Sequence, residues 1–150
     1  MKPETAYLLR LLRAFIQSEA APSLPKDVDG DALARLAKTG NMGGIVGYIT
    51  QPFLHLFSEK AAAFLTRQFY ATVGQFANIG VACDDLFAAL RAENIPFAAV
   101  KGAVLGHLYP VRELRTFGDI DIYVPATFRE AVRAVVAQDT LLWKMTRRYM

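Results

Sequence analysis

Two aspartates in the last third of the sequence are the residues best suited to chemistry. Asp119 and Asp121 lie in the segment 119–124, which alternates polar and apolar residues and is rich in β-branched and aromatic side chains. This pattern predicts a strand. Residues i and i+2 of a strand point to the same face. The two carboxylates are therefore expected to lie side by side, with Ile120 and Ile122 facing the core.

Such a pair of carboxylates is suited to binding a divalent cation. Like charges repel one another at short distance unless a cation lies between them. Mg²⁺ prefers oxygen ligands and commonly binds one or two carboxylates together with substrate phosphates. Asp119 and Asp121 are therefore predicted to be metal ligands and catalytic residues. The alternative is that they form the polar face of a half-exposed strand, because Asp-x-Asp is a frequent tripeptide.

Lys101 and Gly102 form a second candidate, at the junction between a predicted strand and a predicted helix. The first turn of a helix presents free N–H groups and the positive end of the helix dipole, which suits phosphate. A glycine lets the phosphate approach the backbone closely, and the lysine adds a positive charge. The alternative is an ordinary turn with a solvated lysine.

Arg115 is the third candidate, four residues before Asp119 in a polar loop. A guanidinium group binds phosphate and carboxylate groups well. Arg115 is therefore predicted to contact a phosphate or to pair with Asp119 or Asp121. The alternative is a surface arginine without such a role.

The elements that must position these residues follow from hydrophobic periodicity and helix-breaking residues. Apolar residues recur at three- and four-residue spacing in much of the first part of the chain, which predicts helices. The last of these helices is expected to begin after an N-cap at Ser58 and to bend or break near Gly74 or Gly80. The predicted helices are 4–18, 31–38, 43–50 and 58–93, followed by strand 95–100, helix 102–109, strand 119–124 and helix 128–137.

Composition limits the class of protein. The chain has 150 residues, of which 53% are hydrophobic and 21% charged, so it has enough apolar surface for a core. Its formal net charge of +3 permits a polyanionic partner without requiring one. Cys83 is the single cysteine, which excludes a disulfide within the chain and favours a reducing compartment. The sequence lacks a signal-peptide pattern, and glycines interrupt the uncharged stretch 39–58. A cytoplasmic protein with no membrane span is expected.

Several of these features occur together in one known family. The apolar segment Phe97–Val100 leads into Lys101-Gly102, Leu105 lies three residues after that glycine, and Tyr109-Pro110 ends the helix. Arg115, three residues, and Asp119-Ile120-Asp121 then follow. This order and spacing resemble the uncharacterised bacterial nucleotidyltransferase family of the DNA polymerase β superfamily.

The resemblance implies a fold and an activity. It implies an α+β protein, in which a helical N-terminal half (1–93) precedes a small mixed-sheet nucleotidyltransferase-like core (94–150). It also implies transfer of a nucleotidyl group from a nucleoside triphosphate to a protein, small-molecule or RNA acceptor, with Mg²⁺ or Mn²⁺. In this reading Asp119 and Asp121 bind the metal, Gly102 contacts phosphate, Lys101 lies beside it, and Arg115 matches the loop arginine of the family.

The sequence departs from the superfamily at two places. Gly102 is followed by Ala103 where the superfamily usually has serine. The superfamily also has a third carboxylate on a later strand, and the only acidic residues after Asp121 are Glu130 and Asp139. These departures predict a shortened family member that is incomplete at its C-terminal end.

Three functions remain open from the sequence. The first is an Mg²⁺-dependent nucleotidyltransferase. The second is a catalytically impaired pseudoenzyme that binds nucleotides or other proteins. The third is a toxin–antitoxin nucleotidyltransferase. Exposed sheet edge and apolar surface would also favour a homo-oligomer.

Overall fold

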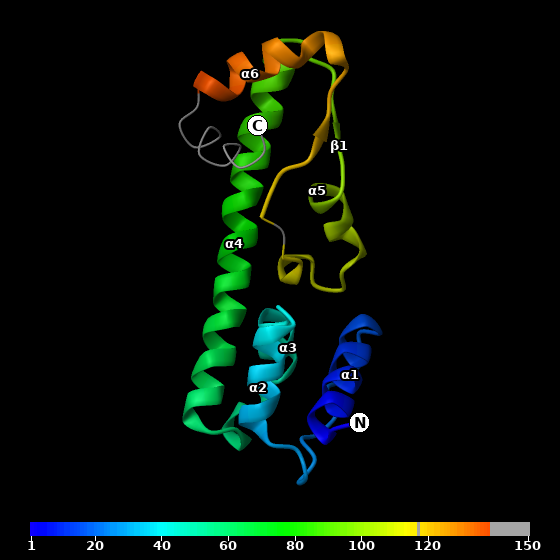
Figure 1. The fold of residues 1–150 in the computed structure, drawn as a ribbon, viewed down its shortest axis with the longest axis vertical. Coiled ribbons are helices and arrows are strands. Elements are labelled where there is room, and N and C mark those ends of the chain that lie inside the picture. Colours follow the sequence, from blue (N-terminus) through cyan, green and yellow to red (C-terminus); the bar gives the residue numbers. More distant parts are fainter. Residues whose placement is uncertain (117, 139–150) are drawn as a thin grey trace. The chain divides into compact units, whose positions relative to one another are not determined.

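The computed structural model of the chain describes residues 1–116 and 118–138. These residues are mainly helical and include one small antiparallel sheet, which is an α+β composition (Figure 1). The chain divides into two compact units. The first comprises Met1–Gly74 and Tyr109–Arg115, and the second comprises Gln75–Leu108 and the described residues from Thr116 onward. The domain boundary that the sequence pattern placed between residues 93 and 94 remains a prediction.

The first unit is built from helices that cover one apolar core. It contains α1 (Pro3–Ile16), α2 (Gly30–Thr39), α3 (Gly43–Ile49), the 3₁₀ helices η1 (Gln51–Leu56) and η3 (Arg112–Leu114), and the beginning of α4 (Glu59–Ala92). Tyr7, Leu11, Leu33, Val46 and Leu65 are almost completely buried in this core. The helices predicted from amphipathic periodicity are therefore present in this unit.

Local hydrogen bonds fix where two of these helices begin. The backbone N–H of Asp31 donates to Oδ1 of Asp29 at 2.9 Å, which caps α2. The backbone N–H of Ala61 donates to Oγ of Ser58 at 3.1 Å, as expected for an N-cap. Each of these bonds satisfies a donor that has no partner within its helix.

The longest helix, α4, is continuous from Glu59 to Ala92. The predicted break near Gly74 or Gly80 is therefore wrong, and the alternative of a bend there stays a prediction. A glycine costs a helix only about 1 kcal/mol relative to alanine. Leu65 in the first core and Leu86 in the second are both buried, so packing on either side of the glycines holds the helix together.

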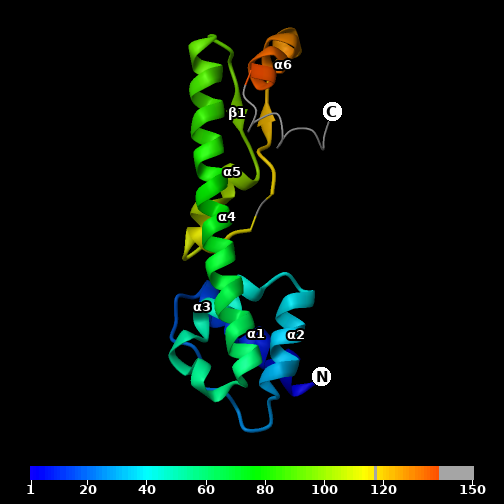
Figure 2. The same cartoon turned by 90° about the vertical axis from the view of Figure 1, so that its left-hand side faces the viewer.

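The second unit places two short strands along the later part of α4 (Figure 2). β1 (Ala98–Ala99) pairs antiparallel with β2 (Ile122–Tyr123), so that Ala98 lies opposite Tyr123 and Ala99 lies opposite Ile122. α5 (Gly102–Leu105), η2 (Gly106–Leu108), η4 (Ala126–Phe128) and α6 (Arg129–Gln138) complete the unit. Its core contains Leu86, Leu90, Ile95, Val135 and Val136.

The elements of this unit are shorter than the sequence predicted. The strands expected over 95–100 and 119–124 form a ladder of two residues each, and the helix expected over 102–109 ends as an α-helix at Leu105. A strand residue counts as paired only where its backbone has a partner. In the described part of the chain, the sheet has these two antiparallel strands alone. The mixed sheet implied by the family resemblance thus remains a prediction.

Candidate functional site

The candidate site lies where the two-stranded ladder ends. Beyond the paired residues of β1, the backbone N–H of Val100 still donates to the carbonyl oxygen of Asp121 at 3.0 Å. This bond continues the antiparallel register by one residue. It holds the segment that leads into Lys101 beside the segment that carries the aspartates.

The alternation predicted around the aspartates is present. Ile120, Ile122 and Val124 pack against the core of the second unit. Successive residues of an extended chain point to opposite sides, so Asp119 and Asp121 lie on the side away from that core. Both are partly exposed. The sequence pattern therefore located the core-facing and outward-facing positions, although β2 itself begins only at Ile122.

Lys101 pairs with one of the two carboxylates. Its ammonium nitrogen lies 3.1 Å from Oδ1 of Asp121. The lysine side chain is 72% exposed and the aspartate side chain 28% exposed. The sequence did not predict this ion pair between Lys101 and Asp121. The antiparallel register, which the sequence alone does not specify, is what brings Lys101 there.

Lys101 also has an unusual backbone conformation. Its φ of 51° and ψ of −115° lie in a region that favours glycine, because the side chain of an L-residue crowds the backbone there. This residue turns the chain from β1 into α5, and its carbonyl oxygen accepts hydrogen bonds from the N–H groups of Val104 and Leu105. A strained residue at a turn beside a charged pair is typical of functional sites.

Gly102 begins α5 and is buried. The α-helical part of this element has four residues, so its dipole is weaker than that of the longer helix predicted from the sequence. The contribution of Gly102 to phosphate binding therefore depends on local backbone N–H groups and on Lys101. That role remains a prediction.

Arg115 belongs to the first compact unit. Its guanidinium carbon lies 6.0 Å from the centroid of the Tyr109 ring, and its neighbour Leu114 is buried in the first core. The second unit thus contains Asp119, Asp121, Lys101 and Gly102. The role of Arg115 at the phosphates stays a prediction.

The carboxylates differ in their surroundings. In the described part of the chain, the Asp119 side chain makes no hydrogen bond or ion pair, whereas Asp121 pairs with Lys101. Glu130 on α6 forms an ion pair with Arg133 at 2.5 Å and is 83% exposed. Among residues 1–116 and 118–138, no three His, Cys, Asp or Glu side chains gather in one group. Asp139, the other candidate for a third carboxylate, lies outside the described residues.

The sequence model of the family described as uncharacterised nucleotidyltransferase matches residues 26–139. The chain belongs to this family. The match includes the segment that contains the candidate site and most of the helical part. The family description indicates nucleotidyl transfer as its general chemistry.

No curated protein and no solved structure matches the chain significantly. None of the described helices is both long enough and apolar enough to cross a membrane.

Proposed function

We propose that this protein transfers a nucleotidyl group from a nucleoside triphosphate to an acceptor, with Mg²⁺ or Mn²⁺. The observation that carries the proposal is the pairing of Lys101 with Asp121, two residues after Asp119, in a chain of the nucleotidyltransferase family. The site thus combines acidic groups that attract a metal with a cation that attracts phosphate. In the reaction, an acceptor oxygen bonds to the α-phosphorus, the bond from that phosphorus to the bridging oxygen breaks, and pyrophosphate leaves.

The donor set fits a hard divalent cation. Two carboxylates lie on the side of the chain that faces away from the core, and the Asp119 carboxylate makes no bond to another described side chain. Mg²⁺ commonly binds through one or two carboxylates, with phosphate and water oxygens completing its ligands. Asp119 and Asp121 would hold the ion. When bound, Mg²⁺ supplies positive charge that offsets the charge of the transferring phosphate.

The remaining residues would position the triphosphate. The Lys101 ammonium group is largely exposed and is anchored at Asp121 by a single contact of 3.1 Å. An exposed ion pair of this kind contributes at most about 1 kcal/mol, so the lysine is free to exchange its carboxylate partner for a phosphate oxygen. Gly102 follows directly in the turn, and Arg115 is proposed as a further phosphate ligand.

The first test is thermal unfolding of the full chain with ATP, GTP, CTP or UTP, each with and without MgCl₂. A ligand at about ten times its Kd contributes about 1.4 kcal/mol to stability. For a chain of this size that is a rise in Tm of roughly 3 to 5 °C. We expect a rise that requires both nucleotide and metal and that is lost in Asp119→Asn.

Asp85→Asn is the matched control, because Asp85 is an exposed aspartate on α4 in the same unit. It should retain the shift. Equal shifts in Asp119→Asn and wild type would contradict the assignment of the metal ligands. Labelling of protein, RNA or small-molecule acceptors with an α-³²P-labelled nucleotide then tests transfer. Binding without labelling of any acceptor would favour the nucleotide-binding pseudoenzyme.

A further inference from the structure

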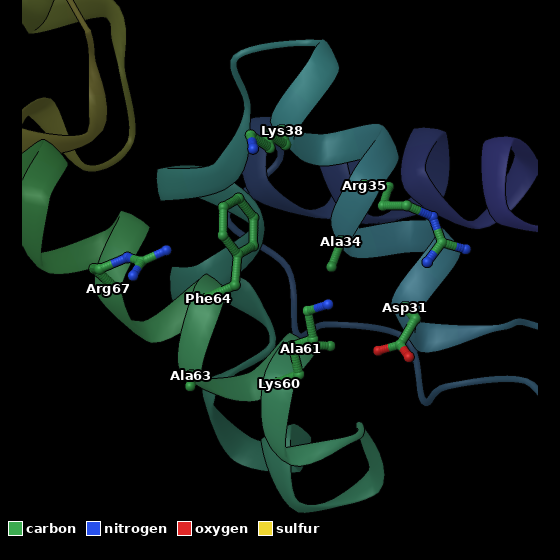
Figure 3. A pocket seen from close by; sticks show the side chains of 9 residues that line it. All are labelled: Asp31, Ala34, Arg35, Lys38, Lys60, Ala61, Ala63, Phe64 and Arg67. Atoms are coloured by element: carbon green, nitrogen blue, oxygen red, sulfur yellow. The ribbon is translucent and has the colours of Figure 1, made fainter.

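The first compact unit contains a pocket that the transfer chemistry does not use. It lies between α2 and the beginning of α4 and has a volume of about 570 Å³ (Figure 3). This volume is within the usual range for ligand sites, roughly 300 to 1,000 Å³. Its lining residues are Asp31, Ala34, Arg35, Lys38, Lys60, Ala61, Ala63, Phe64 and Arg67.

Helical spacing explains why these side chains meet. Asp31, Arg35 and Lys38 recur at intervals of four and three residues on α2. Lys60, Phe64 and Arg67 recur at the same intervals on α4. Residues three and four apart share one helix face, so each helix presents one such stripe to the pocket. This repeated spacing was visible in the sequence, but only the packing of the two helices brings the stripes together.

The pocket has an excess of positive charge. Four of its lining side chains are cationic and one is a carboxylate. Arg35 forms a salt bridge with Asp29 at 3.6 Å, and the Asp31 carboxylate accepts a hydrogen bond from the Ser58 hydroxyl. Of the side chains the structure describes, none forms an ion pair with Lys38, Lys60 or Arg67. These three exposed cations are therefore available to an anionic ligand.

An aromatic ring lies among these cations. Phe64 is half-buried, packs against the first core and lines the pocket. Figure 3 shows Phe64 and Lys60 extending from α4 toward α2. Ala34 and Ala61 are buried small residues in the same lining, so they leave room beside the ring for a flat group.

We propose that this pocket binds single-stranded nucleic acid. Phosphates would contact Lys38, Lys60 and Arg67, and a base would stack on Phe64. Positively charged grooves with aromatic side chains are how proteins bind single strands without reading their sequence. An acidic peptide would match the charges but would not use the ring. The site is independent of nucleotidyl transfer, so either proposal can fail without the other.

Fluorescence anisotropy of the full chain with a 5′-fluorescein-labelled oligouridine of 12 nucleotides tests the proposal. Lys60→Gln combined with Arg67→Gln should weaken binding about tenfold. The negative slope of log K against log salt should become shallower by about 1.4, because each phosphate contact in a single strand contributes about 0.7 to its magnitude. Phe64→Leu keeps the apolar packing and should weaken binding about fivefold or more through lost stacking.

The matched control is Arg10→Gln combined with Arg13→Gln, which removes the same charge from exposed positions of α1 in the same unit. Its binding should stay within about twofold of wild type. Equal losses in both double variants would overturn the proposal in favour of diffuse attraction to a basic protein. No binding at about 0.15 M salt would also overturn it. A third outcome would overturn the proposal: oligoglutamate or uridine monophosphate displaces the labelled RNA at the same concentration at which unlabelled oligouridine displaces it.

Discussion

The ammonium nitrogen of Lys101 lies 3.1 Å from Oδ1 of Asp121, although twenty residues separate them in the sequence. The antiparallel ladder of β1 and β2 makes this contact, because it sets Val100 against Asp121 and turns the chain at the next residue. The same turn gives Lys101 its φ of 51°. One lysine thus supplies both a charge at the carboxylates and a strained backbone conformation, and these two properties can be separated by mutation.

Lys101→Gly and Lys101→Ala should separate them. Both remove the ammonium group, so both should weaken nucleotide binding to the same degree. Only glycine accepts this backbone conformation without crowding, so Lys101→Gly should be more stable to unfolding than Lys101→Ala by about 1 kcal/mol. Urea unfolding measures the difference, and thermal shift with nucleotide and Mg²⁺ measures binding. Equal stabilities would mean that the turn is not strained at Lys101.

Asp119→Asn and Asp121→Asn should lose metal-dependent nucleotide binding while remaining folded. Asp119 makes no bond to another described side chain, and the partner of Asp121 is a largely exposed lysine. Each substitution should therefore change the free energy of unfolding without ligand by less than about 1 kcal/mol. Urea unfolding of the apo variants checks this. A large loss of stability would instead assign the aspartates a structural role.

The sequence predicted the helical part of the fold well, because its helices bury regular apolar stripes. The helix expected over 58–93 is observed as Glu59–Ala92, and Ser58 caps it as expected. The break expected near Gly74 or Gly80 was wrong, because local helix propensity does not include packing at both ends of the helix. The strands came out shorter than expected, because a strand's length depends on partners that one segment cannot specify.

The sequence predicted which positions around the aspartates face outward, but it did not predict the contacts between the candidate site residues. The alternation of Ile120 and Ile122 with the aspartates gave the outward-facing positions correctly. The Lys101–Asp121 contact depends on strand register, and the strain at Lys101 depends on a turn between elements. Neither can be read from residue spacing alone. The basic pocket likewise required the packing of α2 against α4, which joins two stripes that lie far apart in the sequence.

Close packing of α3 against α4 should make Gly47 intolerant of substitution. A Cβ atom at Gly47 would lie 2.3 Å from the carbonyl oxygen of Leu65, whereas one at Gly74 would meet nothing within 4 Å. Gly47→Ala should therefore lower the free energy of unfolding by roughly 2 to 3 kcal/mol. Gly74→Ala, the same change in open space on α4, should raise it by roughly 0.5 to 1 kcal/mol. Urea unfolding compares them, and a neutral Gly47→Ala would contradict this packing.

Stability in alkaline solution should depend on Tyr7. Burial raises the pKa of Tyr7 from 10.0 to about 12, against a smaller opposite effect of the Arg10 charge. Its hydroxyl donates to the carbonyl oxygen of Pro22 at 2.7 Å. Between about pH 10 and 12 the unfolded chain loses the phenolic proton while the folded chain keeps it, so the free energy of unfolding falls as the pH rises.

Tyr7→Phe isolates this contribution from those of the other tyrosines and the lysines. The variant should be less stable than wild type by about 1 kcal/mol at pH 8, through loss of the hydrogen bond. As the pH rises from 10 to 12, the wild type should lose this advantage and then become less stable than Tyr7→Phe, because only the wild type has a buried phenol to ionise on unfolding. Urea midpoints at pH 8, 10 and 11.5 measure it. A constant difference across that range would mean that the Tyr7 hydroxyl titrates alike in the folded and unfolded chains.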